Sequence, residues 1–131
     1  MGHLESVYLS PMVIVADSGG SKIDWRFLLK DGSIGQAHSP GFNPYYQPLE
    51  HLHRIIKESL VPQVKESVTK IFYYGTGVSS EKNQQVIREA FAQYWPEAYI
   101  EIGWDLLAAA RALCGRERGI ACILGTGSNS C

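Results

Sequence analysis

Two short apolar runs each end at a glycine-rich turn, and this arrangement constrains the fold more than any other feature of the sequence. Residues 12–16 form the run Met-Val-Ile-Val-Ala, which stops at Asp17, and residues 120–124 form a similar run that stops at Gly125. A continuous apolar run bounded by turn residues is typical of a buried strand. In an α/β protein both turns then lie at the carboxyl edge of the sheet, where ligands bind.

The segments between these runs predict the fold class. Strands at residues 23–30 and 33–38 flank Asp31 and Gly32, a dipeptide typical of hairpins. Predicted helices then alternate with predicted strands at residues 70–74, 99–102 and 120–124. We therefore predict an α/β protein with a ribonuclease-H-like mixed sheet, in which three antiparallel strands precede alternating helices and parallel strands, with helices on both faces.

Helical periodicity and breakers place the predicted helices. The first helix has apolar residues at helical spacing: Leu49, Leu52, Ile55, Ile56 and Leu60. Pro62 is expected to kink or end it. Ser80 or Asn83 is expected to cap the second helix, which Pro96 stops. A third, rich in alanine and leucine, begins at Asp105.

Composition bounds the partners of this chain. Its 131 residues, about the size of one domain, carry a net charge of −1 without a basic stripe, which argues against nucleic-acid binding. No apolar run approaches the roughly 20 residues that a membrane helix needs, so we expect no membrane association. The three cysteines form no Cys-x-x-Cys pair, and we expect reduced thiols in a cytoplasmic protein. We interpret residues 1–11 as a leader or as added residues outside the domain.

Three segments are candidates for chemistry. The glycines of residues 17–22, Asp-Ser-Gly-Gly-Ser-Lys, would let backbone N–H groups approach phosphate oxygens, with Asp17 near a magnesium ion; an ordinary hairpin turn explains them equally well. Residues 125–129, Gly-Thr-Gly-Ser-Asn, form a second such turn. Asp105 follows a predicted strand and begins a helix, so it is either an N-cap or a general base.

Two further segments are candidates for substrate contact. Asn43 lies in a proline-rich loop, where it either hydrogen-bonds a sugar hydroxyl or stabilises its own turn. Gly75, Thr76 and Gly77 follow a predicted strand and form either a plain turn or a place of close approach to a substrate. The aromatic residues near these segments line a pocket or serve packing: Tyr45, Tyr46 and Trp104.

Together these segments resemble the group that joins the N-acetylglucosamine kinases to the BadF/BadG/BcrA/BcrD ATPases, within the actin-like superfamily. Residues 17–22 resemble its first phosphate motif, with Ser18 where many relatives have glycine, and residues 119–129 resemble its second. Asp105 matches the position of the catalytic aspartate. The resemblance implies ATP and Mg²⁺ in a cleft between two lobes. Residues 12–131 would then be the N-terminal lobe of an actin-like ATPase, truncated before the second lobe.

The resemblance also assigns roles to individual residues. It implies metal binding by Asp17. It implies nucleotide contacts by Asp17, Gly19, Gly20, Ser21, Lys22, Gly125, Thr126, Gly127, Ser128 and Asn129. It implies substrate contacts by Asn43, Gly75, Thr76, Gly77, Asp105 and Thr126.

The leading hypothesis is an enzyme, an ATP-dependent phosphotransferase that acts on an amino sugar such as N-acetylglucosamine or glucosamine, with Asp105 as the proton acceptor. The alternative is an ATPase that activates a partner enzyme by ATP-driven electron transfer, although no cysteines here have cluster spacing. A third is a ribonuclease-H-type nuclease, with Asp17 and Asp105 among its carboxylates. We expect the chain to require the C-terminal lobe of the same protein and to be inactive alone. Its exposed lobe face is compatible with a homodimer.

Overall fold

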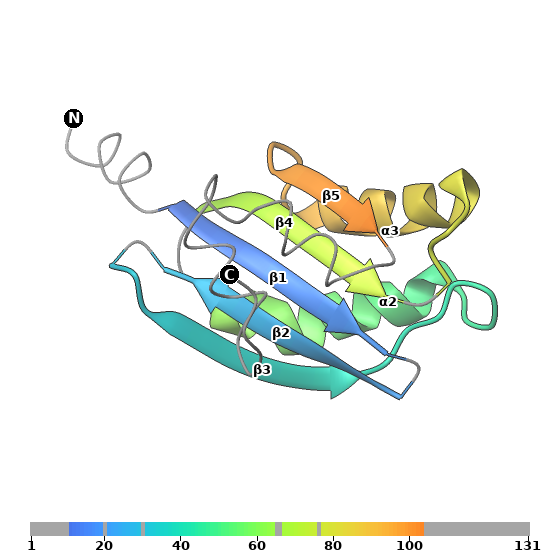
Figure 1. Ribbon diagram of the computed structural model, residues 1–131, viewed down its shortest axis with the longest axis horizontal. Helices are drawn as coiled ribbons and strands as arrows, with labels where there is room; N and C mark the ends of the chain where they lie inside the picture. Colours follow the sequence, from blue (N-terminus) through green and yellow to red (C-terminus); the bar gives the residue numbers. More distant parts are fainter. Residues whose placement is uncertain (1–10, 20, 30, 65–66, 76, 104–131) are drawn as a thin grey trace.

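A five-stranded mixed sheet forms the body of the molecule (Figure 1). The computed structural model describes residues 11–19, 21–29, 31–64, 67–75 and 77–103. The strands are β1 (Pro11–Ser18), β2 (Lys22–Leu28), β3 (Ile34–Pro40), β4 (Ser67–Gly75) and β5 (Tyr99–Gly103). Their order is β3-β2-β1-β4-β5; β1, β2 and β3 pair antiparallel, whereas β4 and β5 run parallel to β1. The predicted α/β class with a ribonuclease-H-like mixed sheet is confirmed.

The central position of β1 explains its continuous apolar run. Ile14 and Ala16 belong to the main hydrophobic core, whereas Val15 projects from the other side of the strand, and all three are buried. Phe72 and Tyr74 of the neighbouring β4 are likewise buried outside that core. A strand that is covered on both faces needs apolar residues at successive positions, as the sequence predicted.

The hairpin between β2 and β3 turns at the predicted Asp-Gly pair. Gly32 has a φ of 90°, a conformation that residues with a Cβ rarely adopt. The Asp31 carboxylate accepts hydrogen bonds from the amide and the hydroxyl of Ser33, at 2.8 and 2.6 Å, and these bonds lower its pKa. The turn is thus fixed by local chemistry, which is why the sequence alone was sufficient to place it.

The strand ends differ from the predicted ones because backbone pairing does not follow hydrophobicity. β2 ends at Leu28, before the predicted residue 30, since the Leu29 amide donates to the Ser33 carbonyl at 2.9 Å inside the turn. β3 extends past His38 to Pro40, which pairs in register with the first residue of β2. β1 and β4 also run beyond the apolar residues that predicted them.

The helical segments are α2 (Leu49–Ile55), its continuation η1 (Ile56–Leu60) with π-helical hydrogen bonding, the 3₁₀ turn η2 (Val61–Gln63), and α3 (Glu81–Tyr94). Pro62 lies in the 3₁₀ turn, so the helix ends there as predicted. Ser80, rather than Asn83, caps α3: its hydroxyl accepts a hydrogen bond from the Asn83 amide at 3.2 Å.

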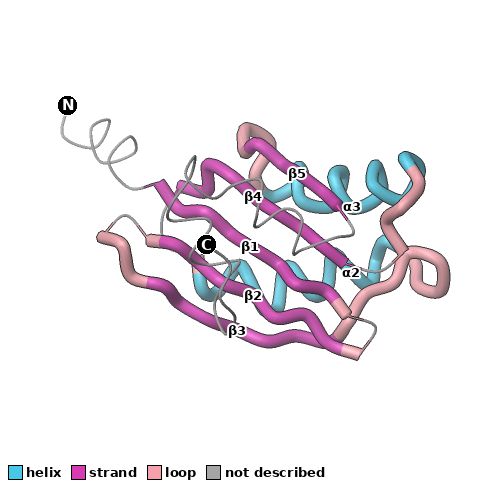
Figure 2. Tube along the Cα trace, in the orientation of Figure 1, coloured by secondary structure: helices cyan, strands magenta, loops and turns pink. Residues whose placement is uncertain are grey.

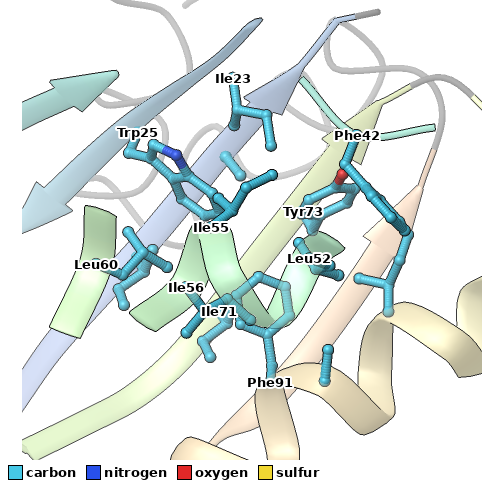
Figure 3. Packing of buried hydrophobic residues seen from close by; sticks show 14 of the residues in the cluster. Ile23, Trp25, Phe42, Leu52, Ile55, Ile56, Leu60, Ile71, Tyr73 and Phe91 are labelled. Atoms are coloured by element: carbon cyan, nitrogen blue, oxygen red, sulfur yellow. The ribbon is translucent and has the colours of Figure 1, made fainter. Parts of the chain in front are cut away.

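Helices α2 and α3 pack on the same face of the sheet (Figure 2). Between helices and sheet, the Trp25 and Phe91 rings meet edge to face at 6.1 Å, and the Tyr73 and Phe91 rings lie 5.9 Å apart (Figure 3). The third helix, predicted from Asp105, lies outside the described residues, so helices on both faces stay a prediction. None of the described helices is long and apolar enough to cross a membrane.

Candidate functional site

The carboxyl ends of four strands meet at one edge of the sheet. β4 and β5 run parallel to β1, and β3 does so as well because it is antiparallel to β2, which is itself antiparallel to β1. Their arrowheads accordingly point the same way (Figure 1). Three predicted site segments leave this edge: the β1–β2 turn (residues 17–22), the β3–α2 loop (residues 41–48) and the β4–α3 segment (residues 75–80). The topology thus gathers them where α/β proteins bind ligands.

These three segments are in direct contact. The Gly41 amide of the β3–α2 loop donates to the Ser21 carbonyl of the β1–β2 turn at 3.2 Å. A Cβ at Gly75 would lie 2.6 Å from the Ser18 Cβ, and a Cβ at Gly77 would lie 2.5 Å from Asn43 Oδ1. Each glycine is therefore required because another segment occupies the space of a side chain.

The β1–β2 turn closes with a hydrogen bond of its own. The Gly19 amide donates to the Lys22 carbonyl at 2.8 Å, so this N–H group is engaged within the turn. Ser21 and Lys22 are exposed beyond it. Within the described part of the turn, the side chains of Ser21 and Lys22 are thus accessible to a ligand.

Asp17 projects from the face of the sheet opposite the helices and reaches solvent. Its pKa is raised, first because the surrounding sheet removes part of its hydration, and then because Asp24 stands directly opposite it on β2. Arg26, two residues further along β2, partly offsets both effects. A cation at this carboxylate would relieve the repulsion between the two aspartates.

Asp24 has a histidine and a lysine as further partners. Its Oδ1 lies 2.7 Å from His38 Nδ1 and 3.8 Å from Lys22 Nζ. The Lys22 and His38 side chains are each 65% exposed, so water and salt screen these pairs. Asp24 therefore holds the Lys22 ammonium close to the turn without burying it.

The carboxylates fit a magnesium ion held mainly by water and phosphate. Within the described residues no three histidine, cysteine or acidic side chains converge to enclose a metal. Mg²⁺ retains much of its water and needs one or two protein carboxylates beside a nucleotide, a set that Asp17 and Asp24 supply.

Asn43 organises the β3–α2 loop. Its Oδ1 accepts from the Tyr45 amide at 2.9 Å, and its own amide donates to Gln47 Oε1 at 2.8 Å. The interpretation that Asn43 stabilises its own turn is thus confirmed, and its Nδ2 group has no hydrogen bond to the described residues. Tyr45 and Tyr46 are 60% and 84% exposed, so they do not serve packing.

In the β4–α3 segment, Gly77 closely approaches other atoms of this protein. Gly77 has a φ of 77°, and its carbonyl accepts from Asn83 Nδ2 at 2.8 Å. Asn83, of which only 8% is exposed, thereby ties this segment to the first turn of α3. From the sequence, Asn83 was considered only as a cap. Its hydrogen-bond partner Gly77 lies in a loop, where no periodic pattern indicates which residues meet.

Several predicted site residues lie outside the part of the chain that the structure describes: Gly20, Thr76, Trp104, Asp105, Gly125, Thr126, Gly127, Ser128 and Asn129. Their assigned roles stay predictions. Of the described candidates, the structure brings Asn43 directly against Gly77. It joins the segments of Ser21 and Gly75 to the site through Gly41 and Ser18. Sequence reasoning missed Asp24 and Tyr73, whose relation to the site follows from strand register and from a contact between distant segments.

Comparison with known proteins gives a likeness at the level of structure. No protein-family profile and no curated protein sequence matches the chain. A candidate N-acetylglucosamine kinase from Porphyromonas gingivalis superposes with a TM-score of 0.65 and 29% sequence identity, over 79% of this chain and 38% of that protein. The PPX-GPPA enzyme of Aquifex aeolicus superposes with a TM-score of 0.47 and 14% identity, over 80% and 42% respectively, which is too distant to support an argument.

The chain therefore spans well under half the length of the kinase-like protein that it resembles. That partial coverage is consistent with one lobe of a larger molecule. The predicted resemblance to the N-acetylglucosamine kinases and the predicted α/β fold class with a mixed sheet are both confirmed.

Proposed function

We propose that this chain is the N-terminal lobe of an ATP-dependent phosphotransferase that acts on a hydroxyl of an amino sugar such as N-acetylglucosamine or glucosamine. The observation that carries the proposal is that the segments of Asp17, Asn43 and Gly77 leave one sheet edge and contact one another through neighbouring residues. It is supported by the likeness in fold to a candidate N-acetylglucosamine kinase. The second lobe of the same protein would complete the cleft.

The nucleotide side of the proposed site is the β1–β2 turn. Bound Mg²⁺ would neutralise charge on the nucleotide phosphates. Asp17 would hold that ion through its carboxylate or through water, which its solvent-exposed position allows. The exposed Lys22 ammonium, 3.8 Å from Asp24, is free to turn toward a phosphate oxygen instead.

The acceptor side is the β3–α2 loop. Asn43 is fixed by its Oδ1 bond to the Tyr45 amide, so its Nδ2 group is oriented to donate to a sugar hydroxyl. The exposed rings of Tyr45 and Tyr46 offer apolar faces beside it, on which a sugar ring can stack. Orienting the acceptor against the donor phosphate is the main task in phosphoryl transfer.

In the proposed reaction the acceptor oxygen forms a bond to the γ-phosphorus as the bond to the β–γ bridging oxygen breaks. ADP leaves with that oxygen, and Asp105 accepts the proton of the sugar hydroxyl. The role of Asp105 rests on the resemblance of the sequence.

The complete two-lobed protein tests the proposal. We expect ADP to form only when an amino sugar is added with Mg²⁺ and ATP, and we expect Asp105→Asn to slow this at least about a hundredfold. Asp31→Asn, in the hairpin at the opposite edge, is the matched control and should leave turnover unchanged. ATP hydrolysis that ignores the sugar and survives Asp105→Asn would refute the proposal. With iron present, that result would favour the partner-activating ATPase.

A further inference from the structure

A buried serine lies where the three site segments meet. Ser18 directly follows Asp17, is only 2% exposed, and pairs in register with Gly75, whose missing side chain admits it. A side-chain hydroxyl buried this deeply needs hydrogen-bond partners within the protein.

The hydroxyl of Ser18 links β4 to the β3–α2 loop. Tyr73 donates its phenolic hydrogen to Ser18 Oγ at 2.9 Å, and Ser18 Oγ lies 3.5 Å from the Phe42 carbonyl oxygen, to which it donates. Tyr73 and Phe42 are both fully buried and lie close together in the core (Figure 3). The chain of donors thus runs from the core to the loop residue that precedes Asn43.

The direction of this chain is fixed. Burial raises the pKa of Tyr73 to about 12, so the phenol keeps its proton at neutral pH and acts as the donor. Since the Ser18 oxygen accepts from Tyr73, its own hydrogen is directed to the Phe42 carbonyl. A second, backbone contact, from the Gly41 amide to the Ser21 carbonyl, joins the same turn and loop.

We propose that Ser18 and Tyr73 act as one pair of positioning residues, which couples nucleotide binding at the β1–β2 turn to the orientation of Asn43 in the β3–α2 loop. This inference rests on the proposed function. A nucleotide that holds the turn also holds Ser18, whose hydroxyl then fixes the Phe42 carbonyl and the neighbouring acceptor-binding residue. Bound nucleotide therefore raises affinity for the sugar, and the sugar raises affinity for the nucleotide equally.

A double-mutant cycle in the complete protein separates this role from ordinary packing. The variants are Tyr73→Phe, Ser18→Ala and their combination, with Tyr94→Phe as control, because that hydroxyl donates to the His53 carbonyl away from the site. In the wild type, magnesium and a non-hydrolysable ATP analogue should tighten N-acetylglucosamine binding about tenfold by calorimetry. In each single variant and in the double variant, the analogue should change the affinity for the sugar only about onefold, because the two residues act as a unit.

Several results would overturn the coupling while the proposed function stands. One such result is that the losses of gain in the two single variants multiply in the double variant. Another is that Tyr73→Phe keeps the tenfold gain. A third is that the variants melt at a lower temperature but keep the gain unchanged. Loss of the gain in Tyr94→Phe would show that any lost phenol produces it, and would count against the pair equally.

Hydrogen exchange gives a readout that does not need catalysis. Adding the magnesium–analogue complex should slow amide exchange in the β3–α2 loop of the wild type and of Tyr94→Phe, but not of Tyr73→Phe. If this pattern holds although no amino sugar is phosphorylated, the proposed function fails and the coupling stands. If the analogue leaves loop exchange unchanged in the wild type, the coupling is refuted.

Discussion

Gly75→Ala tests whether the close approach of β4 to the β1–β2 turn is real. A methyl group there would lie 2.6 Å from the Ser18 Cβ and 2.7 Å from the Ser18 carbonyl oxygen, whereas ordinary contacts begin near 3.4 Å. The two strands must therefore separate by about 0.8 Å, the difference between 3.4 and 2.6 Å. Forcing a group into packed structure costs about 1–3 kcal/mol.

Part of this cost is offset because alanine has fewer conformations than glycine in the unfolded chain, worth about 0.4–1 kcal/mol. We expect a net loss of about 1–2 kcal/mol in the free energy of unfolding. With an m-value of about 1.5 kcal/mol per molar, the urea midpoint should fall by about 1 M, as followed by circular dichroism.

Gly35→Ala is the matched control, since it also replaces a strand glycine. A Cβ there would lie 3.6 Å from the Phe27 ring, an ordinary contact, and Gly35 has no positive φ. Its urea midpoint should stay unchanged or rise slightly. If Gly75→Ala proves as stable as Gly35→Ala, Gly75 and Ser18 are not in close contact, and β4 does not join the β1–β2 turn in one site.

Three further predictions concern charge and capping. Asp17 has a folded-state pKa above 3.8, so its ionised form destabilises the fold, and Asp17→Asn should stabilise the protein at pH 7. Urea titrations should show this gain disappearing as pH falls through the raised pKa, with none left below about 3.8. Asp24→Asn removes a negative charge facing Asp17 and should lower the pKa of Asp17 in a carboxyl NMR titration; an unchanged pKa would contradict the pairing. Ser80→Ala should cost about 1 kcal/mol in urea unfolding, because the Asn83 amide loses its cap, and a loss below a few tenths would contradict it.

The parts of the fold that could be predicted depend on local signals. The turn at Asp31 and Gly32, the cap at Ser80 and the helix end at Pro62 each depend on residues a few positions apart. The strand ends and the π-helical continuation of α2 could not be predicted, because they depend on pairing and packing with distant segments. The helix predicted to begin at Asp105 falls outside the described residues, so it stays a prediction.

The candidate site was predictable in outline and not in detail. The sequence placed the turn that contains Asp17 at the carboxyl edge of the sheet, and the strand directions bring the segments of Asn43 and Gly75 to the same edge. The hydrogen bond from Tyr73 to Ser18 joins residues 55 positions apart, and a core-facing tyrosine gives no indication of which partner its hydroxyl will find.

The parallel pairing of β1 with β4 has a consequence for the folding of this protein. β1 and β2 can form their hairpin locally, but β1 must wait for β4, which follows the whole of β3 and α2 in the chain. Contacts of such high sequence separation form late and slowly. We therefore expect the β1–β2 turn to gain its contacts with Gly75, Tyr73 and the β3–α2 loop late in folding. A species that has lost the β1–β4 pair has lost the site as a whole.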